Sequence, residues 1–152
     1  MNKTKIALFA SAMMLGSLSA VQAAPVKIAV LMYGNKAEFV QLMERFGKEH
    51  PAVKSGEAVL TFYDGRYDAS VQNDQAATAI QTRADAIIVN PMDFEANIDI
   101  VTNANEAKIP VVVTNARLNT DAMTSEVVSN DELGDTWKPK PSWTNSTART
   151  ER

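Results

Sequence analysis

One short apolar run constrains the fold of this chain more than any other feature. Residues 84–93 read Ala-Asp-Ala-Ile-Ile-Val-Asn-Pro-Met-Asp. The consecutive apolar and β-branched residues in this run are typical of a parallel strand that is buried on both faces. Pro91 ends the strand, because proline cannot donate to a ladder and pushes Asn90 toward an extended conformation. The sequence therefore predicts that Asn90 and Asp93 lie at the carboxyl end of a buried strand, where ligands bind in open α/β sheets.

A strand followed by a helix recurs along the chain. Besides the run before Pro91, the predicted strands are Val26–Met32, Ala58–Tyr63, Val111–Thr114 and a short run at Val127 and Val128. Apolar residues at helical spacing predict helices over residues 39–46 and 70–83 and a third around residues 96–104. Pro51 prevents the first helix from continuing. Three such units in succession predict an α/β fold with three layers, in which helices cover both faces of a parallel sheet.

The first residues have the pattern of a secretory signal peptide. Lys3 and Lys5 form a short positive region, residues 6–18 are mostly apolar, and Val21-Gln22-Ala23 fits the small-residue pattern before a cleavage site. The alternative is a membrane anchor, which needs about 20 apolar residues, but serines dilute this segment. We therefore expect residues 1–23 to be removed and the mature chain to be periplasmic.

Composition excludes several classes of function. The chain has 152 residues, a net charge of −3 and no cysteine, so there is no basic excess to suggest nucleic acid and the fold must depend on its apolar core. His50 has no second histidine or cysteine with which to share a metal. Serine nucleophile elbows and glycine-rich phosphate loops are absent from the sequence. We expect no cofactor, no resident metal and no catalysis.

Several segments together resemble a known family. They are the opening strand 27–31, the loop and helix 64–75, the run 84–93 and the stretch 104–113. In this order they resemble the N-terminal lobe of periplasmic sugar-binding proteins of the ribose-binding type, the type I periplasmic binding proteins, over residues 25–134. The resemblance implies the substrate-capture subunit of a bacterial ABC importer. Its ligand would be a monosaccharide or polyol, and its partners an ABC permease in the inner membrane and a chemoreceptor or sensor.

The resemblance also implies a set of ligand-binding residues. Asp68 and Asp93 fall where the family has residues that hydrogen-bond sugar hydroxyls, and Asn115 falls near the polar residue after the fourth strand. Arg117 lies one position later than an arginine that the family has close to this polar residue, and would bind the ligand in its place. A carboxylate suits this role because it accepts charge-assisted hydrogen bonds from two adjacent hydroxyls. The alternative for Asp68 and Asp93 is that each caps the helix that follows it.

The first loop departs from the family pattern. Family members have an Asn-Pro-Phe-Phe-like sequence there, and its aromatic rings stack on the sugar. This chain has Asn35-Lys36-Ala37-Glu38-Phe39 instead. The resemblance therefore implies one aromatic contact from Phe39, with Tyr33 in place of the second ring, and Asn35 as a further ligand-binding residue of this loop. The alternative is that Tyr33 and Phe39 belong to the core.

The end of the chain does not continue the pattern. Ser129-Asn130-Asp131 resembles the start of another helix, but the two prolines at 139 and 141 forbid a helix interior. Read from the third base of the Thr136 codon, the triplets permit Met-Glu-Ala-Lys-Ala-Val-Met-Asp-Lys, which is an amphipathic helix. We therefore expect residues 135–152 to be a non-native or disordered tail produced by a frame change; the alternative is a genuine short tail. On this hypothesis the lobe is incomplete, leaves an apolar surface or sheet edge uncovered, and binds sugar weakly or not at all.

Two other functions remain open from the sequence. A small exported hydrolase would use Asp64, Asp68 and Asp93 as a metal-binding carboxylate cluster, although no nucleophile or general base is identifiable. An exported interaction module would instead dock on a membrane sensor or permease without any sugar.

Overall fold

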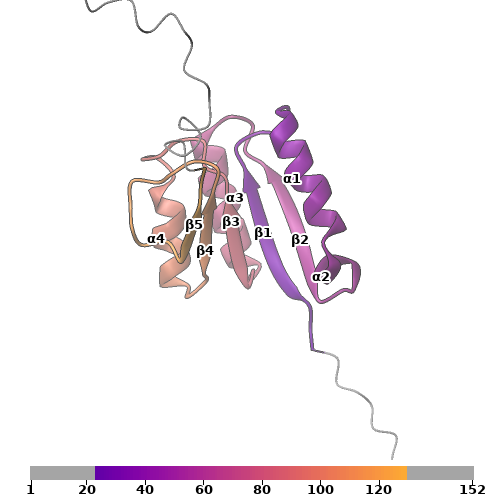
Figure 1. Ribbon diagram of the computed structural model, residues 1–152. Helices are drawn as coiled ribbons and strands as arrows, with labels where there is room; N and C mark the ends of the chain where they lie inside the picture. Colours follow the sequence, from indigo (N-terminus) through magenta and orange to yellow (C-terminus); the bar gives the residue numbers. More distant parts are fainter. Residues whose placement is uncertain (1–22, 130–152) are drawn as a thin grey trace, which may run out of the picture.

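Five parallel strands form one sheet in the part of the chain that the computed structural model describes, residues 23–129 (Figure 1). The strands are β1 (Val26–Met32), β2 (Ala58–Asp64), β3 (Ala86–Val89), β4 (Val111–Thr114) and β5 (Ser125–Val127), in the spatial order β2-β1-β3-β4-β5. The helices are α1 (Glu38–Glu49), α2 (Pro51–Lys54), α3 (Ala69–Gln81) and α4 (Ile98–Glu106). The predicted α/β fold with a parallel sheet is therefore confirmed. The signal peptide expected over residues 1–23 lies almost wholly outside the described residues, as do the tail at 135–152 and the helix start near Asn130.

Helices cover the two faces of the sheet unequally. Alternate residues of β1 point to opposite faces, so Ala29 and Leu31 pack in one core cluster with α3 and α4, whereas Val30 and Met32 pack with Val40 of α1 in a second. The first cluster is the larger and contains the most deeply buried residues. It gathers alternate residues of β3 and β4 with the inner sides of α3 and α4, namely Ile87, Val89, Val111, Val113, Ala76, Ala79, Ile100, Val101 and Ala104.

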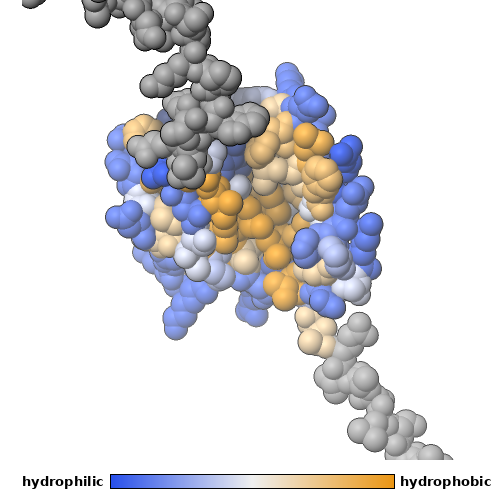
Figure 2. Space-filling view, in the orientation of Figure 1, coloured by the Kyte–Doolittle hydropathy of each residue, from blue (hydrophilic) through white to orange (hydrophobic). Residues whose placement is uncertain are grey.

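The central strand β3 is fully buried on one face only, which corrects the prediction of burial on both faces. Ile87 and Val89 are 0% exposed on the side of α3 and α4, while Ile88 on the other side is half-buried. Val30, Ile88 and Val112 lie in register across β1, β3 and β4. Figure 2 shows hydrophobic side chains exposed along the middle of this face, beside α1. Among the described residues, no helix covers β3 and β4 on this side.

Local signals set the helix ends. Asp68 is the N-cap of α3, and α1 ends at Glu49 before the proline as predicted. Pro51 then occupies the first position of the short helix α2, where its missing N–H is not needed. None of the helices within residues 23–129 is long and apolar enough to cross a membrane.

A matched pair of substitutions tests where the core lies. Val113→Ala removes two buried methyl groups from a fully buried position, so we expect it to lower the free energy of unfolding by about 2–3 kcal/mol. Val59→Ala makes the same change on the edge strand β2, where the residue is 45% exposed. There we expect a loss below about 0.5 kcal/mol. Urea unfolding curves measure both, and equal losses would contradict the described core.

Candidate functional site

The carboxyl ends of four strands meet at one edge of the sheet and form a shallow hollow of about 290 Å³ there. Residues following β1, β2, β3 and β4 line it: Tyr33, Tyr67, Asn90, Pro91, Met92, Asn115 and Ala116. Of the ligand-binding residues predicted from the sequence, Tyr33 and Asn115 belong to this lining. The hollow is open to solvent on one side, so it can hold a small molecule against one wall.

Two tyrosine rings form the aromatic part of this wall. The centroids of Tyr33 and Tyr67 are 5.7 Å apart and the rings meet edge to face at 62°. The backbone N–H of Lys36 donates to the Tyr67 hydroxyl at 3.2 Å. Gly34 makes room for the ring, because a Cβ at this position would lie 2.5 Å from Cζ of Tyr67. An aromatic face of this kind can pack against the apolar face of a small polar ligand.

Tyr67 was not predicted as a site residue. Arg66 and Tyr67 both have positive φ, 54° and 63°, an uncommon conformation for residues other than glycine. This turn swings the ring back toward Gly34. The signal available in the sequence was an aromatic residue within the short loop between Asp64 and Asp68, where turn-forming residues dominate.

Asn90 supplies a buried polar group to the hollow. The residue is 0% exposed, and its Oδ1 accepts a long hydrogen bond from Nδ2 of Asn115, at 3.3 Å. Its own Nδ2 has no hydrogen-bond partner anywhere in residues 23–129. A buried donor left unpaired costs about 1–3 kcal/mol. A ligand acceptor that reaches this donor recovers that free energy. The sequence placed Asn90 at the strand end but did not identify it as a ligand-binding residue.

Asp68 caps α3, as the alternative interpretation predicted, whereas Asp93 binds N–H groups of the turn before α4, whose N-cap is Asn97. Oδ1 of Asp68 accepts from the N–H groups of Ser70 and Val71 at 2.8 and 3.3 Å. Oδ1 of Asp93 accepts from Ala96 at 2.7 Å and Glu95 at 2.9 Å. Neither residue lines the hollow, although Oδ2 of each is unengaged within the described structure. Contact of these two carboxylates with a ligand stays a prediction.

Hydrogen bonds to its carboxylate change the acidity of Asp93. The backbone N–H groups of Ala96 and Glu95 hold the pKa of Asp93 below the ordinary aspartate value, and desolvation opposes them. The carboxylate is therefore fully ionised near neutral pH. An ionised carboxylate is an acceptor for hydroxyl donors.

The structure places the other predicted site residues outside the hollow. Phe39 lies in the first turn of α1 and is 46% exposed. Asn35 lines a different hollow, beside Met32 and Glu44, and its carbonyl accepts from Nε2 of Gln41. Arg117 is exposed beyond the end of β4. None of these three residues lines the hollow with Tyr33 and Asn115, so their contact with a ligand stays a prediction.

The predicted metal-binding alternative is wrong. No group of three or more His, Cys, Asp or Glu residues within the described range 23–129 is placed to hold a metal ion. Instead, Oδ1 of Asp64 accepts from the N–H of Arg66, and Oδ1 of Asp68 accepts from the N–H of Ser70 at the start of α3. The carboxylate cluster of Asp64, Asp68 and Asp93 is not formed.

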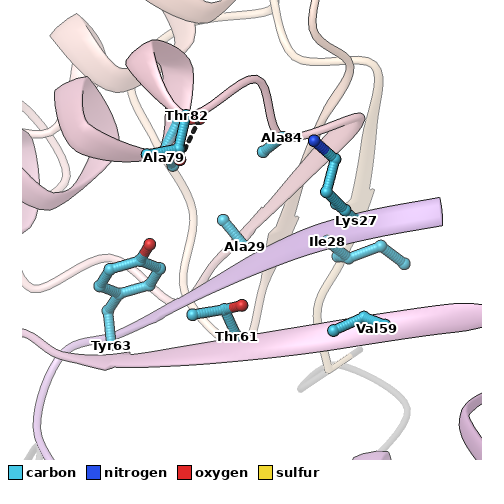
Figure 3. A pocket seen from close by; sticks show the side chains of 9 residues that line it. All are labelled: Lys27, Ile28, Ala29, Val59, Thr61, Tyr63, Ala79, Thr82 and Ala84. Atoms are coloured by element: carbon cyan, nitrogen blue, oxygen red, sulfur yellow. Dashed lines mark hydrogen bonds between the residues drawn. The ribbon is translucent and has the colours of Figure 1, made fainter. Parts of the chain in front are cut away.

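A second hollow, of about 220 Å³, lies on the face of β1 and β2 that packs against α3, near the end of that helix (Figure 3). Its residues are Lys27, Ile28, Ala29, Val59, Thr61, Tyr63, Ala79, Thr82 and Ala84. The lining shares no residue with that of the hollow at the carboxyl edge. It provides a separate location against which ligand binding can be compared.

Comparison with known proteins gives the class of protein. Residues 28–136 match the family described as periplasmic binding protein domain. The chain is 30% identical to the D-galactose/methyl-galactoside binding periplasmic protein of Haemophilus influenzae over 157 aligned residues, which cover 93% of this chain and 47% of that protein. The chain therefore belongs to the periplasmic binding protein family.

Solved structures of related proteins agree with this assignment. An ABC transporter solute binding protein from Bacillus halodurans with bound myo-inositol is 30% identical, with a TM-score of 0.60 over 68% of this chain and 36% of its own. One from Agrobacterium vitis with bound D-fucose is 25% identical, with a TM-score of 0.63 over 70% of this chain and 38% of its own. The chain thus spans about half the length of the galactose-binding relative and less of these two.

The acidity of Asp93 generates a test. A carboxyl group whose pKa is lowered by folding stabilises the fold above its unfolded-state pKa, and this contribution is lost as the pH falls through the folded-state pKa. We expect Asp93→Asn to be less stable than wild type near neutral pH and to lose less stability between about pH 7 and pH 3. Urea unfolding at each pH measures this.

Asp74→Asn is the matched control, because the Asp74 side chain accepts no hydrogen bond within residues 23–129. We expect it to follow the pH dependence of wild type. The same pH dependence in Asp93→Asn as in wild type would contradict the role of the capping turn.

Proposed function

We propose that this chain provides one wall of the sugar-binding site in a substrate-binding component of an ABC sugar importer. The single observation that carries the proposal is the unpaired, buried Nδ2 of Asn90, a residue that lines a hollow beside two tyrosine rings. A monosaccharide or polyol matches this wall, because its hydroxyls accept from amide donors while its apolar face packs on aromatic rings.

The related proteins support the choice of ligand class. Their names record D-galactose or methyl-galactoside, myo-inositol and D-fucose as what they bind. All four compounds are small and rich in hydroxyl groups. The proposed activity is capture of such a compound in the periplasm, without catalysis and without a cofactor.

The carboxylates of Asp68 and Asp93 extend the proposed wall. Each has one oxygen that no described residue engages, and hydroxyl groups are the donors that this oxygen prefers. Asn115 adds a further amide at the hollow. Tyr33 and Tyr67 supply the rings, so the proposed site combines aromatic, amide and carboxylate groups as small-molecule sites do.

The proposed partners follow from the same function. A substrate-capture subunit delivers its ligand to an ABC permease in the inner membrane, and a chemoreceptor or sensor is a second proposed partner. Export would depend on the signal peptide proposed for residues 1–23, the segment before β1.

Titration of the full chain with sugars tests the proposed site. A wall open on one side that supplies half the free energy of a micromolar site gives a dissociation constant of about 1 mM. We expect D-galactose, D-fucose or myo-inositol to cause saturable NMR shifts of the amides of Tyr67, Asn90 and Met92 in this range. Saturable shifts around the second hollow, which Lys27 and Thr82 line, would contradict the proposal, and so would the absence of saturable shifts with all of these ligands. Micromolar affinity would contradict a wall that is open on one side.

A matched pair of variants localises the binding. Asn90→Ala removes the unpaired donor and only one long hydrogen bond, so we expect at least about tenfold weaker affinity, equivalent to about 1.4 kcal/mol. Asn105→Ala removes an exposed amide on α4 that donates to the carbonyl of Ala122. We expect the affinity of this control to equal that of wild type.

A further inference from the structure

Three buried polar residues lie together behind the carboxyl edge: Gln72, Asn90 and Asn97, each 0% exposed. Burial of an amide is unfavourable unless its donors and acceptor are paired. Of the three, Gln72 and Asn97 have both ends of their side chains hydrogen-bonded. Their partners belong to segments far apart in the sequence.

Asn97 connects the turn of Asp93 to the start of α3. Its Oδ1 accepts from the N–H groups of Met92 and Asp93 at 3.1 and 3.0 Å. Its Nδ2 donates to the carbonyl of Ala69 at 3.1 Å and to Oδ1 of Asn73 at 3.0 Å. Ala69 directly follows Asp68, so one side chain spans the two turns that carry the exposed carboxylates.

Asn73 adds a second connection between the same elements. Its Nδ2 donates to the carbonyl of Ala96 at 2.9 Å, one residue before Asn97. Together the two asparagines make reciprocal hydrogen bonds between the first turns of α3 and the loop that enters α4. The loop cannot shift relative to α3 without breaking several of these bonds.

Gln72 fixes the end of β3 in the same way. Its Nε2 donates to the carbonyl of Asn90 at 3.0 Å and its Oε1 accepts from the N–H of Met92 at 2.8 Å. Pro91, between Asn90 and Met92, has no N–H with which to continue the strand ladder. The Gln72 side chain instead pairs with the backbone on both sides of this proline, where the ladder ends. Gly65 leaves the space for it, because a Cβ there would lie 2.6 Å from Cγ of Gln72.

We propose that Asn97 is a positioning residue for the ligand: it sets the separation of the Asp68 and Asp93 turns, while Gln72 holds Asn90 at the hollow. This inference rests on the proposed function. Asn97 is not among the residues that line the hollow at the carboxyl edge, so it acts through the residues it holds. The carboxylates and the Asn90 amide then meet a ligand without having to be ordered on binding, which lowers the entropic cost of association.

A variant pair separates positioning from general stabilisation. Asn97→Leu keeps the approximate volume and removes all four hydrogen bonds. Gln75→Leu is the matched control, because it removes a part-buried amide of α3 that donates to the carbonyl of Asp64, away from the Met92–Asp93 turn. If Asn97→Leu does not fold, Asn73→Ala replaces it in the experiment. This substitution removes the hydrogen bonds of Asn73 with Ala96 and with Asn97, at a residue that is not fully buried.

NMR on the full-length variants gives two readouts that need no ligand. We expect Asn97→Leu to speed hydrogen exchange at the amide of Asp93 by at least about tenfold relative to Gln75→Leu, because its acceptor is lost, and at the amide of Met92 by less, because Oε1 of Gln72 still accepts from it. The pKa of Asp93 should rise toward its ordinary value as the turn loosens. Asn73→Ala should change both in the same direction by less. Equal exchange and equal titration in Asn97→Leu and Gln75→Leu would overturn the proposal.

Sugar affinity, measured at equal folded fraction, is the third readout. We expect at least about tenfold weaker binding in Asn97→Leu and none of this loss in Gln75→Leu. A loosened turn with unchanged affinity would overturn the positioning role. If wild type binds no sugar, the proposed function fails, while exchange and the Asp93 titration still decide whether Asn97 fixes the turn.

Discussion

Burial of β3 against α3 and α4 is the constraint on which the rest of the structure depends. Ile87 and Val89 are fully buried there. Burying two such side chains stabilises the fold by about 3–6 kcal/mol. This fixes the register of β3 between β1 and β4 and so decides where the strand stops. Because all five strands are parallel, the residues after Val89 lie at the same edge as those after β1, β2 and β4.

The uneven helix cover follows from topology. Right-handed crossovers place α1, between β1 and β2, on one face, and α3 and α4, whose connections run the other way across the sheet, on the opposite face. Within residues 23–129, Val30 on the face shared with α1 is buried with Val40 of α1, whereas Ile88 and Val112, which follow it in register toward β5, are only half-buried. The uncovered apolar surface was expected from a frame change in residues 135–152, which lie outside the described range, so that expectation stays a prediction. The expectation that β3 is buried on both faces was wrong.

Local features of the fold were predictable from the sequence, whereas long-range contacts were not. Val26–Met32 and Val111–Thr114 are strands with the predicted bounds, because composition and flanking turns determine them. The cap at Asp68 is equally local. Tyr67 reaches the hollow only through two consecutive positive φ angles, and Asn97 binds Ala69, which is 28 residues away. No pattern of polarity in a short window carries such contacts. Phe39, Asn35 and Arg117 were expected at the site from the resemblance alone; they do not line the hollow, and their contact with a ligand stays a prediction.

Two proposals meet at the carboxyl edge of the sheet: the hollow there holds a sugar, and Nδ2 of Asn90 donates a hydrogen bond to that sugar. A crystal structure of the chain with a bound monosaccharide tests this most directly. We expect a sugar oxygen within about 3.2 Å of Nδ2 of Asn90, with the sugar against the ring of Tyr67. A sugar bound in the hollow between Lys27 and Thr82, or at the carboxyl edge without contact to Asn90, would contradict it.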